Sequence, residues 1–399
     1  MRELGADDLK RLFAQERSRT SPPADFRLPK ELPAGRYTDQ RYWDLEQTYF
    51  WPKRWVCAGR EEQVSRPGDY LQFQKLGRDI VIVRAESGEL RAFYNTCQHR
   101  GGPLVGEKCG RAKRLTCAYH AWTYNLQGDL VSVPSEREFP GLDKQAKSLK
   151  QVRVECWGGW VFVNEDPEAE PLLDYLDPIP DEMAMMQGEN LRLVYEYSFE
   201  VPCNWKVNSD AFLEVYHIKT IHPQTIAPMV DTDATVMEMY RNGHGMFAMP
   251  YKGGMSDPYR DRAANSDRVP QAGESGDLRE FASLTYVAFP NFHAPLTLDG
   301  YHILLMWPIS IDRTELQIYQ LASDWGEGPA PAYWEDSKQG LEKVIEEDVS
   351  LFGKLQRSLG EHGVSSSPLG YSERRIHHFH VQVDDFIGRD RIPADLLAS

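Results

Sequence analysis

The chain has no long apolar run. Its richest stretch, residues 301–311, is interrupted by Pro308 and falls well short of the ~18 apolar residues that a membrane-spanning helix needs. The N-terminal segment mixes acidic with basic side chains and lacks the apolar core of a secretory signal. These absences predict a cytoplasmic protein without a membrane-embedded part.

Positive charge and cysteine are also scarce. The 45 Lys and Arg residues stand against 60 Asp and Glu residues, which gives a net charge of −15. This balance disfavours non-specific binding to nucleic acid or to anionic membranes, and it suits docking to a basic patch on a partner protein. Only six cysteines occur in 399 residues. Because a cytoplasmic location disfavours disulfides, these cysteines need another explanation.

The residues that are present indicate a globular protein with several parts. Hydrophobic residues make up 41% of the chain, enough for a sizeable core. Shifts in composition predict an N-terminal helical segment over residues 1–49 that packs on the C-terminal domain, a β-rich domain over 50–165, and an α+β domain over 166–399. Local patterns predict helices near 6–17, 39–55, 205–221 and 333–359, strands at 79–84, 90–95, 157–164 and within 284–322, and a polar loop over 254–276.

Two short Cys-His pairs stand out within the β-rich domain. One residue separates Cys97 from His99, two separate Cys117 from His120, and seventeen lie between the pairs. Two cysteines and two histidines can form a tetrahedral zinc site. They can equally hold a [2Fe–2S] cluster, with both cysteines on one iron and both histidines on the other. The spacing alone leaves both alternatives open.

The residues around these pairs, CQHRGGPL and CAYHAWTYNLQGDL, resemble the cluster-binding loops of Rieske oxygenases. The resemblance implies that Cys97 and Cys117 bind one iron, and that His99 and His120 bind the other. Respiratory Rieske proteins carry an additional cysteine in each loop, and its absence here favours an oxygenase. We expect the remaining four cysteines to be buried free thiols: Cys57, Cys109, Cys156 and Cys203.

A second candidate metal-binding group follows the predicted domain boundary. Glu214 and His217 are spaced to share one face of a helix, and His222 precedes Pro223. The two histidines lie about 140° apart on an ideal helix, so both reach one ion only if the helix bulges or ends between them. This run resembles the mononuclear iron motif of Rieske oxygenases, in which both histidines bind non-haem Fe(II).

The resemblance implies a third iron ligand, an Asp on a long C-terminal helix. The segments EED at 346–348 and LQR at 355–357 match that region, and Asp348 is the candidate ligand. Glu347 is the rival, although adjacent helical residues lie about 100° apart and cannot face one ion equally. Two histidines and one carboxylate leave positions open for O₂ beside a bound substrate.

Glu214 occupies the position of a carboxylate that connects the two metal centres in Rieske oxygenases. By resemblance, it links His217 to His120 of a neighbouring subunit in a homotrimer. Asp210, one helical turn earlier, is a rival for this role. Ring-hydroxylating dioxygenases usually have Asp at the position of Glu214. The Glu is more similar to oxygenases of quaternary amines, as is the segment HHFH at 377–380.

The resemblance covers about residues 40–390 and implies an all-β Rieske [2Fe–2S] domain inserted in a helix-grip (START/Bet v 1-like) catalytic domain with an antiparallel sheet. It also implies the terminal oxygenase component of a system that takes electrons from NAD(P)H. A flavin or [2Fe–2S] reductase, or a ferredoxin, is the expected partner, and O₂ is the co-substrate.

The substrate is the least determined part of the expectation. Many aromatic and apolar residues follow His222, and they favour hydroxylation of an aromatic or other apolar small molecule. Glu214 and HHFH favour the alternative, oxidative N-demethylation or hydroxylation of a quaternary ammonium compound such as carnitine, choline or a betaine. A third alternative is an electron carrier without mononuclear iron, which the set Glu214, His217, His222 and Asp348 disfavours.

Overall fold

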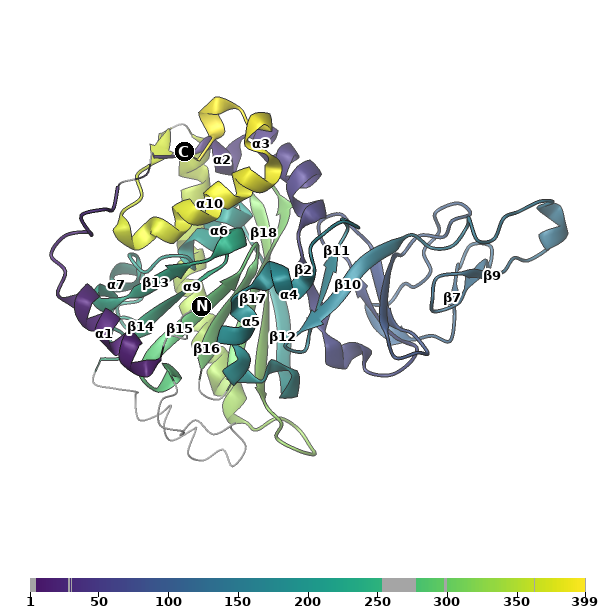
Figure 1. Ribbon diagram of the computed structural model, residues 1–399, viewed down its shortest axis with the longest axis horizontal. Helices are drawn as coiled ribbons and strands as arrows, with labels where there is room; N and C mark the ends of the chain where they lie inside the picture. Colours follow the sequence, from purple (N-terminus) through teal and green to yellow (C-terminus); the bar gives the residue numbers. More distant parts are fainter. Residues whose placement is uncertain are drawn as a thin grey trace. The chain divides into compact units, whose positions relative to one another are not determined.

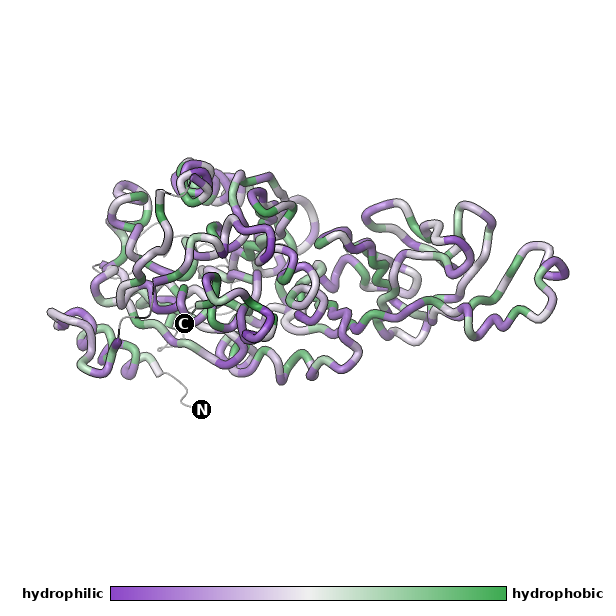
Figure 2. Tube along the Cα trace, turned by 90° about the horizontal axis from the view of Figure 1, so that it is seen from above, coloured by the Kyte–Doolittle hydropathy of each residue, from purple (hydrophilic) through white to green (hydrophobic). Residues whose placement is uncertain are grey.

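The computed structural model describes residues 5–27, 29, 31–252, 278–297, 300–361 and 363–398, so the loop predicted over 254–276 lies outside the described residues. The chain forms two compact units (Figure 1). Residues 51–175 form one, and residues 1–50 together with 176–399 form the other. Hydrophobic and hydrophilic residues are interspersed along the described trace in Figure 2, and no described helix combines the length and apolar character that a bilayer crossing requires.

The inserted unit, residues 51–175, is built from antiparallel β-strands. A seven-stranded sheet has the order β2-β11-β10-β5-β4-β3-β6, and a small sheet has the order β7-β8-β9. The predicted hairpin is confirmed, because β4 pairs with β5. The bounds are β2 Val56–Arg60, β3 Asp69–Phe73, β4 Ile80–Arg84, β5 Leu90–Tyr94, β6 Cys109–Arg111, β7 Leu115–Thr116, β8 Thr123–Tyr124, β9 Leu130–Ser132, β10 Gln151–Trp157 and β11 Trp160–Asn164; the short helix α4, Leu172–Leu176, follows.

The cysteines of this unit differ in burial. Cys97 and Cys117 belong to a core cluster with Phe93, Trp122 and Tyr124. Cys57, like Cys203 of the other unit, is buried as expected, whereas Cys156 is only partly buried. The expectation was wrong for Cys109, which is exposed. The reason is its place at the start of β6. This strand forms one edge of the sheet, and all three of its residues are exposed.

The larger unit combines a second antiparallel sheet with helices, which confirms the predicted α+β class. The seven strands of this sheet have the order β12-β18-β17-β16-β15-β14-β13. The strands are β12 Leu191–Val201, β13 Val236–Met239, β14 Gly245–Pro250, β15 Ala282–Ala288, β16 Phe292–Thr297, β17 Gly300–Ser310 and β18 Arg313–Ser323; a small pair is formed by β1 Leu32–Pro33 and β19 Ser366–Ser367. The helices are α1 Ala6–Arg17, α2 Gly35–Thr38, α3 Gln40–Leu45, α5 Ile179–Glu182, α6 Trp205–Ala211, α7 Ile218–Ile221, α9 Tyr333–Gly360 and α10 Arg374–Ile387.

The long helix α9 lies over one face of this sheet (Figure 1). Its buried residues include Ile345, Asp348, Phe352 and Gln356, which are spaced three or four positions apart and therefore share one face of the helix. A carboxylate on this buried stripe is unusual, because burying a charge without a partner is costly. The helix thus presents Asp348 toward the interior of the unit.

Candidate metal centres

Two loops of the inserted unit share one backbone conformation. Each starts with a cysteine whose N–H donates to the carbonyl five residues ahead, and whose carbonyl accepts from the amide four residues ahead; all four bonds measure 2.9 Å. Gly101 and Ala121, at equivalent positions, both have a left-handed φ, of 77° and 56°. The loops that begin at Cys97 and Cys117 are therefore structural equivalents, although their sequences differ.

These loops bring the two predicted Cys-His pairs together. The ring centroids of His99 and His120 are 4.7 Å apart, and His99 stacks on Trp122 with an interplanar angle of 9°. Among the described residues, Nδ1 of His99 is buried without a hydrogen-bond partner. A buried nitrogen in this state is costly unless it binds a ligand such as a metal ion. The side-chain set therefore fits a metal cluster.

The sulfur atoms occupy a buried position as well. Burial raises the pKa of the Cys97 thiol above its usual value, so a thiolate at this position needs a positive partner such as a metal. Tyr124, which the sequence analysis did not single out, contacts Cys97 Sγ through its hydroxyl at 3.4 Å and accepts a hydrogen bond from the Gln98 amide at 3.0 Å. Its proton is therefore available to the sulfur, and hydrogen bonds to sulfur tune the potential of iron–sulfur clusters.

The second predicted group also comes together. His222 Nε2 lies 3.1 Å from Asp348 Oδ1, and His217 Nε2 lies 3.7 Å from the same oxygen. One ligand atom from each residue falls within 4.8 Å of the others. Donor atoms that share one first-row metal ion at about 2.1 Å have separations of this size. Two histidines and one carboxylate form the facial set typical of non-haem iron oxygenases.

Both histidines are supported from behind by a carboxylate. Nδ1 of His217 bonds Glu214, and Nδ1 of His222 lies 2.7 Å from Oε2 of Glu347. Thr225 donates to the same Glu347 oxygen at 2.6 Å. Partial burial alone would raise the pKa of Glu347, but the hydrogen bonds from His222 and Thr225 lower it below its ordinary value. Glu347 is therefore ionised, and it contacts His222 on the side of the ring opposite Asp348.

The local backbone differs from the expectation. The prediction that Glu214 and His217 share one face of a helix was wrong, because α6 ends at Ala211 and α7 begins at Ile218. The carboxylate of Glu214 accepts hydrogen bonds from the amides of Tyr216 and His217. Side-chain bonds of this kind compete with helical hydrogen bonds. The requirement that the helix end between His217 and His222 is met separately, because α7 ends at Ile221 and His222 follows it.

Asp210, the rival of Glu214, is engaged elsewhere. Tyr37 donates its hydroxyl hydrogen to Asp210 at 2.6 Å, and Nε2 of His380 lies 3.1 Å from the same carboxylate. Arg36 donates to Nδ1 of His380 at 3.0 Å, so Nε2 must carry the ring hydrogen and donate to Asp210. Asp210 thus belongs to an internal network that no pattern in the sequence indicated.

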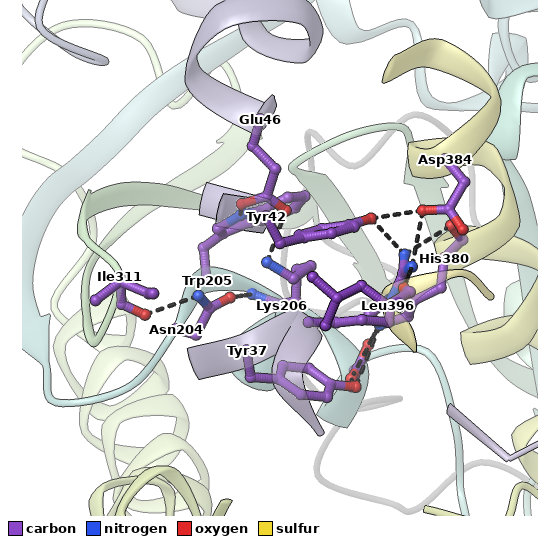
Figure 3. A network of polar contacts seen from close by, with 12 residues as sticks. Tyr37, Tyr42, Glu46, Asn204, Trp205, Lys206, Ile311, His380, Asp384 and Leu396 are labelled. Carbon is purple, nitrogen blue, oxygen red and sulfur yellow. Dashed lines mark hydrogen bonds and ion pairs between the residues drawn. The ribbon is translucent and has the colours of Figure 1, made fainter. Parts of the chain in front are cut away.

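This network anchors α6, the helix that precedes the metal-binding turn (Figure 3). Lys206 is fully buried and pairs with Glu46 at 2.6 Å, while Asn204 caps the helix by accepting from the Lys206 amide at 3.0 Å. Arg36 and Tyr42 both bond Asp384, each at 2.7 Å. Breaking such a buried pair leaves an uncompensated charge and costs about 3–5 kcal/mol. The network therefore fixes α6 against the N-terminal segment and α10.

A cavity of about 420 Å³ adjoins the His-His-Asp group. Its wall is mainly apolar, with three aromatic rings from Phe212, Phe247 and Tyr251. Among the described residues of the wall, Lys343 is the only Lys or Arg, and it is an exposed residue of α9. Burial lowers the pKa of His302, another wall residue, to about 4, so this imidazole is uncharged at neutral pH.

The aromatic and apolar residues that follow His222 in the sequence are divided by the fold. Phe247, Tyr251 and Met229 line the cavity. Others are buried core residues away from its wall: Tyr286, Phe289, Phe292, Met306 and Trp307. Side chains on one strand alternate between the two faces of a sheet, and only the register of the sheet decides which of them face α9.

Comparisons with known proteins place the chain in a family. Residues 54–157 match the model of the Rieske [2Fe-2S] domain, and residues 188–389, half of the chain, match that of the ring hydroxylating alpha subunit (catalytic domain). The chain is 29% identical over 389 residues to the carnitine monooxygenase oxygenase subunit of Escherichia coli K12, covering 89% of this chain and 96% of that protein.

Two further similarities agree with this placement. The chain is 34% identical to the carnitine monooxygenase oxygenase subunit of Acinetobacter baumannii over 206 residues, which is 51% of this chain and spans about half, 54%, of that relative. The solved structure of the quaternary ammonium Rieske monooxygenase CntA with L-carnitine has a TM-score of 0.75 at 25% identity, covering 92% of this chain and 99% of that chain.

A Rieske domain joined to an α+β domain with a His-His-Asp group defines a Rieske non-haem iron oxygenase. The chain belongs to the ring hydroxylating alpha subunit family of these enzymes. Its cofactors are a Rieske [2Fe–2S] cluster and a mononuclear iron, the latter at His217, His222 and Asp348. The predicted family and cofactors are thereby confirmed.

Proposed function

We propose that this chain is the terminal oxygenase of a multicomponent system that oxidises a small quaternary ammonium compound, by hydroxylation or N-demethylation. The observation that carries the substrate class is the electrostatic character of the cavity. Its wall combines three aromatic rings with the carboxylates of Glu214 and Asp348, and the only described Lys or Arg, Lys343, is exposed. Aromatic faces attract a trimethylammonium group. The similarity to carnitine monooxygenase subunits supports the same class.

The two units have different roles in this proposal. Cys97 and Cys117 would hold one iron of the cluster, and His99 and His120 the other. When bound, the cluster and the mononuclear iron supply electron transfer and O₂ activation. The apolar wall excludes water and holds the substrate beside His217 and His222. Glu214 orients His217 through Nδ1, and in a homotrimer it would also contact His120 of a neighbouring subunit.

The redox partner is a reductase or ferredoxin that takes electrons from NAD(P)H. The net charge of −15 favours a basic docking surface on that partner. Association driven by such opposite charges weakens as salt rises.

An aromatic or apolar substrate is the second candidate. The specific observation in its favour is the large apolar share of the wall, which includes Ile218, Ile226, Met249, Leu296 and Leu304. A neutral molecule can bind to such a wall without aromatic faces, because the favourable binding free energy then comes from apolar area removed from water.

The deciding experiment is reductase-coupled O₂ uptake with matched substrate pairs. Each trimethylammonium compound is compared with its neutral isostere, for example choline with 3,3-dimethylbutanol. Substrate-dependent uptake with the cation only supports the proposal, and uptake with the neutral isostere and with aromatic compounds supports the second candidate. Phe212→Leu and Tyr251→Leu should raise the KM of a cationic substrate about 3- to 30-fold, the range expected from one lost cation–π contact.

A further inference from the structure

Glu347 and the iron ligand Asp348 are neighbours on α9, yet they contact His222 from opposite sides. Asp348 faces Nε2 of the ring at 3.1 Å, whereas Glu347 faces Nδ1 at 2.7 Å. An ionised carboxylate can only accept a hydrogen bond, so the contact with Glu347 requires the ring hydrogen on Nδ1. A neutral imidazole protonated at Nδ1 leaves the Nε2 lone pair free for a metal ion.

The surroundings of Glu347 fix its direction. Thr225, three residues after His222, donates to the same Oε2 atom at 2.6 Å. The side chain of Glu347 is 23% exposed, while that of His222 is only 1% exposed. The carboxylate therefore joins the His222–Thr225 turn to α9 with two hydrogen bonds, in a site with limited access to water. The helix α9 also buries the apolar side chains of Ile345 and Phe352, so these two bonds are not its only anchor.

From this geometry we propose that Glu347 is a positioning residue for the mononuclear iron. It sets the tautomer and the ring orientation of His222, and does not bind the metal itself. Carboxylates that accept from the second nitrogen of a ligating histidine raise its basicity, and their removal typically lowers metal affinity about 10- to 100-fold. The inference concerns the iron site only and does not depend on the substrate class proposed above.

The support for the two iron histidines is of two kinds. Glu214 holds His217 from the same turn of the chain, where it also accepts hydrogen bonds from the amides of Tyr216 and His217. Glu347 holds His222 from a different element, α9, which also carries the third ligand. A movement of α9 would therefore shift the Asp348 ligand and the support of His222 together.

The test measures metal binding without substrate or reductase. Full-length protein with an intact Rieske cluster and no mononuclear iron is titrated anaerobically with Fe(II), and the nitric oxide adduct of the bound iron is recorded by EPR. We expect Glu347→Ala to lower Fe(II) affinity about 10- to 100-fold and to change the shape of the adduct signal. Glu347→Gln, which keeps an acceptor oxygen, should show a smaller loss. Glu346→Ala, at the exposed neighbouring position, is the matched control and should behave like the wild type.

Two outcomes overturn the inference. If Glu347→Ala binds Fe(II) with wild-type affinity and an unchanged adduct signal, the carboxylate does not position His222. If Glu347→Ala and Glu347→Gln both abolish binding as completely as Asp348→Ala, Glu347 is itself a ligand. The visible spectrum of the Rieske cluster reports folding of each variant, and Glu347→Gln preserves the test if the Ala variant does not fold. None of these results bears on the substrate class, which the O₂-uptake experiment tests separately.

Discussion

His217 and His222 present their Nε2 atoms to one carboxylate oxygen of Asp348, although His217 precedes α7 and His222 follows it. A single turn of helix between them places both rings on one ion, at a ring-centroid distance of 5.3 Å. The site is thus made from the two ends of a four-residue helix and one residue of α9.

Removing one of these rings should abolish one metal centre and leave the other intact. We expect His217→Ala to lose the mononuclear iron and all turnover, while the visible spectrum of the cluster is retained, because the cluster lies in the inserted unit. Iron per chain should fall from about three to about two. Turnover at the wild-type rate in this variant would show that the iron site is assigned to the wrong residues.

Glu214→Gln tests the proposed link between centres. If Glu214 contacts both His217 and the neighbouring subunit's cluster histidine, its substitution should slow substrate-dependent oxidation of the reduced cluster at least about 10-fold. Glu347→Gln is the matched control, because Glu347 also supports an iron histidine but lies on α9. Stopped-flow absorbance measures the rate in both. Equal rates in the two variants would contradict a separate role for Glu214.

Lys343→Gln distinguishes among quaternary ammonium substrates. Lys343 is the only described Lys or Arg in the cavity wall, and a substrate carboxylate would pair with it there. An exposed ion pair contributes about 0.5–1 kcal/mol, so KM for carnitine or a betaine should rise about 2- to 5-fold with kcat unchanged. KM for choline, which lacks a carboxylate, should not rise. Steady-state O₂ uptake gives both constants, and an equal rise for choline would exclude the pairing.

Gly102→Ala should weaken the cluster site. A Cβ atom at this position would lie 2.9 Å from Cys117 Sγ and 3.4 Å from Tyr119 Cβ. The distance to Cys117 Sγ is shorter than real Cβ contacts, so the two loops must move apart. We expect less cluster per chain in the purified variant, measured as visible absorbance and acid-labile sulfide. Gly106→Ala is the control, because its Cβ would meet nothing within 4 Å; identical cluster content in both variants would contradict the packing argument.

The buried histidine of β16 should make stability depend on pH. Burial, with a contribution from Arg375, lowers the pKa of His293 to about 3, below its ordinary value of 6.5. As pH falls below about 6.5, the unfolded chain binds a proton that the folded chain does not, so stability falls toward low pH. The slope from this group is about 1.4 kcal/mol per pH unit. Between pH 7 and pH 5, the melting temperature of His293→Leu should therefore fall less than that of the wild type. Equal decreases would contradict this prediction.

The sequence determined the chemistry of the two sites better than their backbone. Cys97, His99, Cys117 and His120 were recognisable because their spacing and neighbours form a compact local motif. Helices α1 and α9 were predicted well, since their apolar periodicity is a local property. The break after Ala211 was not predicted, because it depends on the hydrogen bonds that the Glu214 carboxylate accepts from two backbone amides.

Residues that act across long separations in sequence escaped the prediction. The role of Glu347 depends on His222, 125 residues away, and that of His380 on Arg36 and Asp210, 344 and 170 residues away. Adjacent acidic residues on a helix give no sign of which one faces an ion. Only the register of α9 against the metal-binding turn separates Asp348 from Glu347.

The interrupted course of the chain has a consequence for biosynthesis. Residues 51–175 form a contiguous unit, so all of its partners are available soon after they leave the ribosome. Arg36, in contrast, bonds Asp384, 348 residues later, and the carbonyl of Leu396. The larger unit therefore cannot complete its core before Asp384 and Leu396 have been synthesised, and protease resistance of nascent chains should appear first in the inserted unit. Maturation of the iron–sulfur centre can accordingly precede that of the oxygen-activating site.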